Sequence, residues 1–502
     1  MRLRLTLPAS MSDGHFVRSL LRAVPLEERS HSSMARRGTL GMLGVLAQGG
    51  VRFLTNILVG RLGGPAVLAT VASAASTAQL LSLVGPTTTG SAAAKFLAQA
   101  RGRAESGEIA AVAAHLAHRT VQTAVALAAV AAPLWVLVDG GGWAEGLCVS
   151  LLVLAYSGYS FTRGLQFGAG QVQRAATYDV LTGTLALAGI LAALLAGVRG
   201  IYVLLPLAAA YLLFTVANWP WSASGRPIVS LRREMDSFVG LGVIGTLASA
   251  GFLQLSMIIA RLGDDAISAG YYAAAMTLAT PPSLISVSLS LVLFPALAES
   301  LGRGDQAGFR RRVDISSRFL IAVVFPFFGI LILCSDLIVH VIWGNRFDGA
   351  AELLPIMFSA VMVNTLGVPS VNSLTTRSQL GMKLSTGSTL FGMLCGIATW
   401  VAVTPALGVL GVTIGYFCGS VVIVAIPVAS VWRRDQQPWG RLALRLVCGC
   451  TALLVLYLAE REVGASPWSD LLFAALFAAA WSALMRKDIR IALRTIYRRR
   501  VT

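Results

Sequence analysis

Charged side chains are scarce in this chain of 502 residues, and acidic ones are the scarcest. Asp, Glu, Lys and Arg make up 13% of the sequence, whereas a soluble domain has about one quarter. Hydrophobic residues make up 56%, and the mean hydropathy is +0.73. The 23 acidic residues face 40 Lys and Arg, which gives a formal net charge of +17. This composition excludes a soluble globular protein. We assign the positive charge to loops that face anionic membrane lipids, not to nucleic-acid binding.

Motifs for catalysis and cofactor binding are also lacking. The sequence has no phosphate-binding loop that ends in Gly-Lys-Ser/Thr, no His-Glu-x-x-His and no Gly-x-Ser-x-Gly. Its six cysteines show neither zinc-ligand spacing nor a disulfide framework. His115 and His118 are three residues apart, but no carboxylate partner is evident, so we expect them at the cytoplasmic membrane surface. We therefore expect no enzyme activity, no metal and no cofactor.

The chain has instead about fourteen apolar stretches of membrane-spanning length, which is ~20 residues. The stretches are roughly 38–60, 66–89, 112–138, 143–162, 177–197, 201–221, 238–260, 271–298, 318–342, 350–372, 384–404, 407–432, 441–460 and 467–486. We therefore predict an all-α polytopic membrane protein.

Basic residues fall almost entirely into every second connection between these stretches. The other connections hold only Arg61, Arg199, Arg261, Arg346 and Arg461. Cytoplasmic loops collect Lys and Arg, so this alternation predicts the orientation of every span. We expect a multi-pass protein of the bacterial cytoplasmic (inner) membrane with both termini in the cytoplasm.

An internal repeat predicts the domain organisation. Arg61-Leu62-Gly63 and Arg261-Leu262-Gly263 each lie between two apolar stretches, six spans apart. Six spans preserve orientation, so the repeat indicates two pseudo-symmetric six-helix lobes related by an axis along the membrane normal. The predicted divisions are a cytoplasmic N-terminal extension (1–37), an N-lobe (38–222), a cytoplasmic inter-lobe loop (223–237), a C-lobe (238–435), two C-terminal spans (436–486) and a basic cytoplasmic tail (487–502).

The candidate site begins in the first span, where Gln48, Arg52, Thr55 and Asn56 recur at helical spacing. An arginine at the centre of a spanning helix costs ~2.5–3.5 kcal/mol on insertion scales, so Arg52 should face a cavity or the bundle interior. The alternative is that Arg52 snorkels toward the outer surface, about eight residues or ~12 Å away. The sequence leaves both interpretations open.

Further polar positions lie at comparable depth in other spans. Arg163 in the fourth, Gln254 in the seventh and Asn364 in the tenth are candidates for the same cavity. Mid-helix prolines mark hinges or kinks, because proline removes a backbone hydrogen bond; these are Pro281, Pro282 and Pro369. Acidic residues are rare in the spans, so a cavity with arginine and amides suits an anionic or polar ligand such as a phosphate or a sugar.

The order of these motifs resembles the polysaccharide-biosynthesis (Wzx-type) flippases of the multidrug/oligosaccharidyl-lipid/polysaccharide (MOP) exporter superfamily. The resemblance covers most of residues 36–435. It is carried by the first-span arginine, the stretch Arg61-Leu62-Gly63-Gly64-Pro65, the triplet at 261–263, and the run from Val371-Asn372-Ser373-Leu374 through Gly381-Met382-Lys383.

The resemblance implies that undecaprenyl-diphosphate-linked oligosaccharide crosses to the outer leaflet by alternating access, through a cationic cavity between two lobes. Arg52 matches the first-span arginine of the family. The equivalent position in the second lobe is Phe252, so the cavity lining departs from symmetry. Arg52 and Arg163 would pair with the diphosphate, and Gln48, Asn56, Gln254 and Asn364 would contact sugar or phosphate.

Three alternatives stay open. They are a peptidoglycan lipid-precursor flippase, a multidrug or cation antiporter of the same superfamily, and a membrane polysaccharide polymerase or ligase. An antiporter needs a membrane-embedded carboxylate, which the first two spans lack, and a polymerase or ligase would have a long outer loop with Arg and His. The expected partners are the lipid-linked oligosaccharide, anionic membrane lipids and a polysaccharide polymerase or other assembly proteins, with no nucleic acid.

Overall fold

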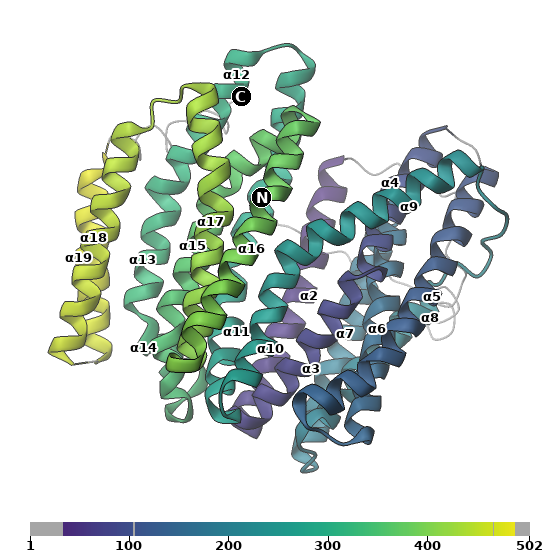
Figure 1. Cartoon of the computed structure of the whole chain (residues 1–502), viewed down its shortest axis with the longest axis horizontal. Helices are drawn as coiled ribbons and strands as arrows, with labels where there is room; N and C mark the ends of the chain where they lie inside the picture. Colours follow the sequence, from purple (N-terminus) through teal and green to yellow (C-terminus); the bar gives the residue numbers. More distant parts are fainter. Residues whose placement is uncertain (1–33, 104–105, 465, 487–502) are drawn as a thin grey trace, which may run out of the picture.

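The computed structural model describes residues 34–103, 106–464 and 466–486, and of residues 34–47 only the backbone (Figure 1). Most of the predicted N-terminal extension and the whole basic tail lie outside the described residues. Thirteen stretches of the described part are long and apolar enough to cross a membrane, and they follow the second to the fourteenth predicted span in order. Helix α2 (Met34–Gly63) takes the position of the first. The predicted all-α polytopic architecture is confirmed.

The helices follow one another with short connections. The first half contains α3 (Pro65–Leu83), α4 (Pro86–Arg103), α5 (Ser106–Asp139), α6 (Trp143–Gly168), α7 (Val172–Leu195), η1 (Gly200–Leu204), α8 (Leu205–Asn218), α9 (Val229–Thr246), η2 (Leu247–Gly251) and α10 (Phe252–Gly263). The second half contains α11 (Ala266–Gly302), α12 (Gln306–Phe319), η3 (Leu320–Val324), α13 (Phe325–Leu333), α14 (Ser335–Trp343), η4 (Asn345–Phe347), α15 (Asp348–Arg377), α16 (Gln379–Leu407), α17 (Val409–Asp435), α18 (Gly440–Val463) and α19 (Pro467–Leu484).

Some predicted spans are interrupted helices. The second span ends with α3 at Leu83, and α4 begins at Pro86, where a proline is tolerated because the first helical N–H has no partner. The π-helical turns η2 and η3 interrupt the seventh and ninth spans, and Cys334 separates α13 from α14. Helix α9 begins at Val229, so its first turns extend into the stretch predicted as the inter-lobe loop.

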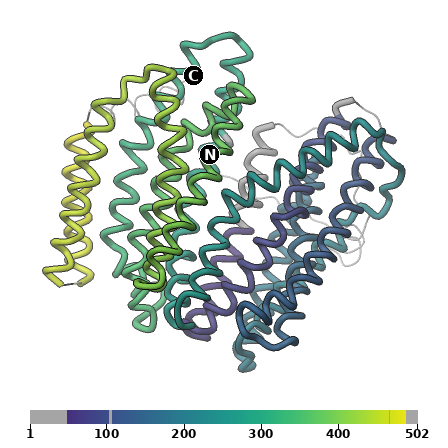
Figure 2. The backbone as a smooth tube through the Cα atoms, viewed as in Figure 1, coloured from purple at the N-terminus to yellow at the C-terminus, as the bar shows by residue number. Residues whose placement is uncertain are grey.

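The helices form two groups that converge at one end and diverge at the other (Figure 1). Helices α4–α8 make up one group and α12–α17 the other, with α2, α3, α10 and α11 between them at the converging end. The diverging end carries α12 and the start of α9, whose basic residues predict the cytoplasmic side. Helices α18 and α19 form one margin of the molecule (Figure 2), where Phe325 of α13 packs on Trp481 of α19 at 4.5 Å between ring centroids.

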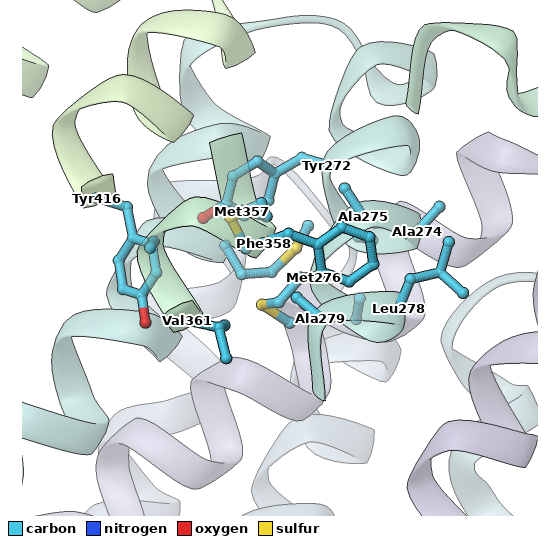
Figure 3. Close-up of a cluster of buried hydrophobic side chains, with 14 of the residues drawn as sticks. Tyr272, Ala274, Ala275, Met276, Leu278, Ala279, Met357, Phe358, Val361 and Tyr416 are labelled. Carbon is cyan, nitrogen blue, oxygen red and sulfur yellow. The ribbon is translucent and has the colours of Figure 1, made fainter. Parts of the chain in front are cut away.

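The core of the C-lobe lies between α11, α15 and α17. Tyr272 and Met276 of α11 gather with Met357 and Phe358 of α15, and Tyr416 of α17 lies beside them (Figure 3). All five side chains are buried. Tyr272 donates a hydrogen bond to the Ser256 hydroxyl at 2.6 Å, so its polar end is satisfied inside this apolar core.

Polar contacts between the two predicted lobes concentrate at the converging end, which carries the loops predicted to face outside. The Arg61 guanidinium donates to the backbone carbonyls of Val341 and Ile342 in α14. Arg261 of α10 forms an ion pair with Asp139 at the end of α5, with 3.0 Å between Nε and Oδ1. Both repeat arginines therefore reach across to the opposite predicted lobe, which gives the position shared by the two repeats a structural role.

Glycine permits the closest backbone approach at the same end. A Cβ on Gly270 of α11 would collide with the backbone of Pro65 in α3, and a Cβ on Gly60 of α2 would collide with the Trp343 ring of α14. Backbones this close exclude any larger residue unless the helices separate. The lobes are therefore held tightly at the predicted outer end.

Candidate functional site: an unpaired arginine in the N-lobe

Arg52 lies in a narrow pocket within the N-lobe. Helices α2, α3, α6 and α8 supply its polar lining, which consists of Arg52, Thr55, Asn56, Ser76, Gln79, Tyr156 and Tyr211. Met276 of α11 also lines the pocket, so it touches the boundary with the C-lobe. The cavity has a volume of about 40 Å³, which is room for one or two water molecules. In this conformation it can receive a small charged group but not a whole oligosaccharide.

Arg52 has no anionic partner in the described part of the chain. No acidic residue is among the described residues that line the pocket, and no hydrogen bond or ion pair joins Arg52 to another described residue. Arg377 of the C-lobe is a contrast, because it pairs with the buried Asp435 at 2.6 Å. An arginine is expensive inside a membrane span, so an uncompensated one is poised for an anion.

Asn56 sits on the same face of α2 and links the lobes. Its side-chain amide donates to the Thr277 hydroxyl of α11 at 2.8 Å. Thr277 in turn donates to the backbone carbonyl of Ala273 at 2.7 Å. Of the predicted stripe, Arg52, Thr55 and Asn56 line one pocket, and Asn56 also contacts α11.

Gln48 lines a second, smaller cavity of the predicted N-lobe, and this cavity shares Leu207 and Tyr211 with the first. Asp179 of α7 also lines it, with its side chain 2% exposed. Arg163 pairs with Asp179 at 3.0 Å between Nε and Oδ2, and the Tyr159 hydroxyl donates to the same carboxylate at 2.7 Å. Arg163 thus already has an internal counter-ion, and its contact with a diphosphate stays a prediction.

The remaining predicted residues lie elsewhere. Gln254 is buried in α10, and its side-chain carbonyl has no hydrogen-bond partner among the described residues. Asn364 of α15 donates to the Ser420 hydroxyl at 3.2 Å. Neither is among the residues that line the Arg52 pocket. Phe252, the counterpart of Arg52, packs between Trp400 and Tyr416 at centroid distances of 5.0 and 5.1 Å. The position equivalent to Arg52 therefore lies in an aromatic cluster and carries no charge.

The three prolines do not interrupt their helices. Helix α11 continues through Pro281 and Pro282, and α15 continues through Pro369. The Thr280 hydroxyl donates to the backbone carbonyl of Met276 at 3.0 Å, a side-chain-to-backbone hydrogen bond in the turn that precedes the prolines. A hinge at these positions stays a prediction.

Several residues of this region were not among the sequence candidates. Tyr211 and Gln79 line the Arg52 pocket from α8 and α3, where neither the spacing nor the charge signals them. A carboxylate partner for His115 also exists, contrary to expectation. Asp236 of α9 lies 3.2 Å from its Nε2 and 2.9 Å from Arg119. These partners are far apart in the chain, so only the folded structure identifies them.

Comparisons with known proteins bear on the family and the fold. Residues 153–352 match the polysaccharide biosynthesis protein family. No curated protein matches the sequence. Among solved structures, the fold is similar to a lipid II flippase MurJ in an inward closed conformation, with a TM-score of 0.71 and 13% identity over 90% of this chain and 99% of that chain.

Two further structures have a similar fold. An inward-facing multidrug resistance MATE family transporter of the MOP superfamily has a TM-score of 0.62 and 15% identity, over 78% of this chain and 94% of that chain. A MOP superfamily transporter from Pyrococcus furiosus has a TM-score of 0.51 and 17% identity, over 83% of this chain and 98% of that chain. The family match supports the predicted resemblance to polysaccharide-biosynthesis proteins over residues 153–352, and the fold is that of the MurJ and MATE structures.

Proposed function

We propose that this chain, a multi-pass membrane protein with the MOP fold and a polysaccharide-biosynthesis family match, is a lipid-linked oligosaccharide flippase. Its substrate would be an undecaprenyl-diphosphate-linked oligosaccharide, moved from the inner to the outer leaflet of the bacterial cytoplasmic membrane for surface polysaccharide synthesis. The protein would bind and move this lipid without chemical change, so it would not be an enzyme.

The observation that carries the proposal is the unpaired Arg52. A guanidinium forms bidentate, charge-assisted hydrogen bonds with phosphate oxygens. The pocket adds the amides of Asn56 and Gln79 and the hydroxyls of Tyr156 and Tyr211, all of which can donate hydrogen bonds to a diphosphate or a sugar. A cationic drug would be repelled by the same lining, which argues against a multidrug antiporter.

Alternating access is supported by the placement of the contacts between the lobes. Arg61 and the Arg261–Asp139 pair close the predicted outer end, and the helices diverge at the predicted cytoplasmic end. The TM-score is 0.62 to the inward-facing MATE family structure and 0.51 to an outward-facing one. We infer that this conformation is the inward one, and that the outer contacts separate when the substrate is released.

An apolar groove on the C-lobe supports a lipid as the ligand. It lies between α15, α17 and α18 and has a volume of about 240 Å³. Its described lining is aliphatic apart from Trp432, Trp439, Ser317 and Ser370. Tryptophans favour the membrane interface, and both lie next to the loop predicted to be cytoplasmic. A prenyl chain needs such apolar surroundings while its diphosphate occupies a polar site.

A peptidoglycan lipid-precursor flippase is the second candidate, because the likeness to the lipid II flippase MurJ covers nearly the whole chain. Such a precursor also carries a diphosphate on a prenyl chain, so the Arg52 pocket suits it equally. The family match at residues 153–352 favours surface polysaccharide instead.

The test is lipid analysis of a strain that lacks the protein. We expect a lipid-linked oligosaccharide to accumulate on the cytoplasmic leaflet and surface polysaccharide to be lost, with both restored by the wild-type chain. Accumulation of the peptidoglycan precursor with loss of viability would favour the second candidate. Unchanged lipid-linked sugars with altered drug sensitivity would contradict both.

A further inference from the structure

A cavity of about 330 Å³ opens where α14 meets the outer ends of α15 and α19. In Figure 1, α14 and α19 lie to the left of α2, α3, α6 and α8, the helices that supply the polar lining of the Arg52 pocket. The titratable residues that line the cavity are Asp336, His340, Asp348 and Asp470. It is thus an acidic cavity on the face predicted to be outside, and the flippase mechanism above does not use it.

Asp470 is a buried acidic residue in the lining of the cavity. The residue lies in the first turn of α19 and is 1% exposed. One carboxylate oxygen, Oδ2, accepts a hydrogen bond from the backbone N–H of Leu337 at 3.1 Å, which caps the first turn of α14. The other oxygen, Oδ1, has no hydrogen-bond partner among the described residues. Buried polar atoms almost always have a partner, so the free oxygen calls for a ligand.

Glu460, in the last turn of α18, supplies a second buried carboxyl group. It is 3% exposed, and neither of its oxygens has a hydrogen-bond donor among the described residues. Its side chain interacts with the Asp470 side chain. An ionised carboxylate only accepts hydrogen bonds. Two of them in contact repel each other, and one must be protonated or a cation must lie between them.

The surroundings do not neutralise this pair. Asp336 and His340 of α14 and Asp348 and Glu352 of α15 add mainly negative charge. The nearby base is Arg461, whose guanidinium stacks over the Tyr457 ring at 5.2 Å and forms no ion pair with either acid. No three His, Cys, Asp or Glu side chains of the described chain are grouped so as to hold a metal ion. A single proton therefore suits the site better than a divalent metal.

We propose that Glu460 and Asp470 form a proton-binding carboxyl pair, which takes up its proton from the outer side through this acidic cavity. The bound proton joins the outer ends of α18 and α19, and Asp470 joins both to α14 through Leu337. Loss of the proton leaves two buried carboxylates in contact, which drives the ends of α18 and α19 apart. The pair thus makes the docking of the two C-terminal helices on the C-lobe depend on outer pH.

The experiment is infrared spectroscopy of the purified full-length protein in lipid vesicles at neutral pH. A protonated carboxyl group has a carbonyl stretching band that a carboxylate lacks. We expect one such carboxyl per protein in the wild type, its loss in Glu460→Gln, and its retention in Glu462→Gln. Glu462 is an exposed acid two residues along α18 and so is the matched control. Absence of the band in the wild type, or its persistence in Glu460→Gln, would overturn the proposal.

A stability measurement on the same proteins distinguishes a proton from a metal cation. The folded wild type retains a proton that the unfolded chain releases near the ordinary carboxyl pKa of about 4. Its melting temperature should therefore fall as the pH rises from about 5 to about 8. Glu460→Gln, whose amide donates to Asp470 without a proton, should lose this dependence. Dependence on sodium but not on pH, with choline as the replacement cation, would overturn the proposal.

Discussion

Replacement of Arg52 by alanine should weaken diphosphate binding without loss of folded protein. Arg52 has no partner among the described residues, so its removal leaves no buried acid unpaired. A hydrogen bond to a charged group contributes about 1.5–3 kcal/mol, which corresponds to roughly 10- to 150-fold weaker binding. Arg52→Lys retains the charge but not the planar fork, and it should recover part of the affinity. Calorimetric titration with undecaprenyl diphosphate in detergent measures these differences.

The control for this experiment is Leu54→Ala. Leu54 lies two residues from Arg52 on α2, is 47% exposed and is not among the residues that line the pocket. Its truncation should leave binding unchanged. Undecaprenyl monophosphate, which carries fewer phosphate oxygens, should also respond less to Arg52→Ala than the diphosphate does. Wild-type affinity in Arg52→Ala would refute the assignment of Arg52 as the phosphate ligand.

Three further predictions concern stability and the contact between the lobes. Arg163→Ala strands the buried Asp179 carboxylate and should cost about 3–5 kcal/mol. The double variant with Asp179→Ala should restore most of the melting temperature, and a stable single variant would show that the pair is unimportant. Gly270→Val should disrupt the contact between Gly270 and Pro65 at the predicted outer end and stop transport. Gly387→Val, in open space on α16, should leave transport unchanged. Equal transport activity of the two variants would contradict the role of this close approach. Phe252→Ala leaves a cavity between Trp400 and Tyr416 and should lower the free energy of unfolding by about 3–5 kcal/mol, measured by thermal unfolding. A loss of less than ~1 kcal/mol would contradict the packing described.

The path of the chain through the membrane could be read from the sequence because long apolar stretches and alternating basic loops reflect bulk properties of the bilayer. The π-helical turns were not predicted, since η2 and η3 lie inside continuous apolar stretches whose periodicity gives no warning. The break at Cys334 was missed for the same reason. The repeat identified Arg61 and Arg261, but their role in closing one end depends on Asp139 and on backbone carbonyls of α14.

The candidate site was predictable only where one helix carries it. Arg52 and Asn56 share a face of α2, and helical spacing was enough to group them. Ion pairs between helices could not be predicted from the sequence, because nothing local to an arginine indicates whether an acid far away in the chain neutralises it. Arg163 illustrates the difference, as Asp179 lies on the next helix and turns it from a free cation into half of an ion pair.

Flipping by the purified protein tests the central claim most directly. The protein would be reconstituted into vesicles whose inner leaflet holds a lipid-linked oligosaccharide with a fluorescent sugar, and a membrane-impermeant quencher would report its arrival outside. We predict that the wild type moves this lipid and that Arg52→Ala, at equal protein level, does not. Wild-type vesicles that flip no lipid-linked oligosaccharide, or an Arg52→Ala protein that flips it at the wild-type rate, would contradict the account.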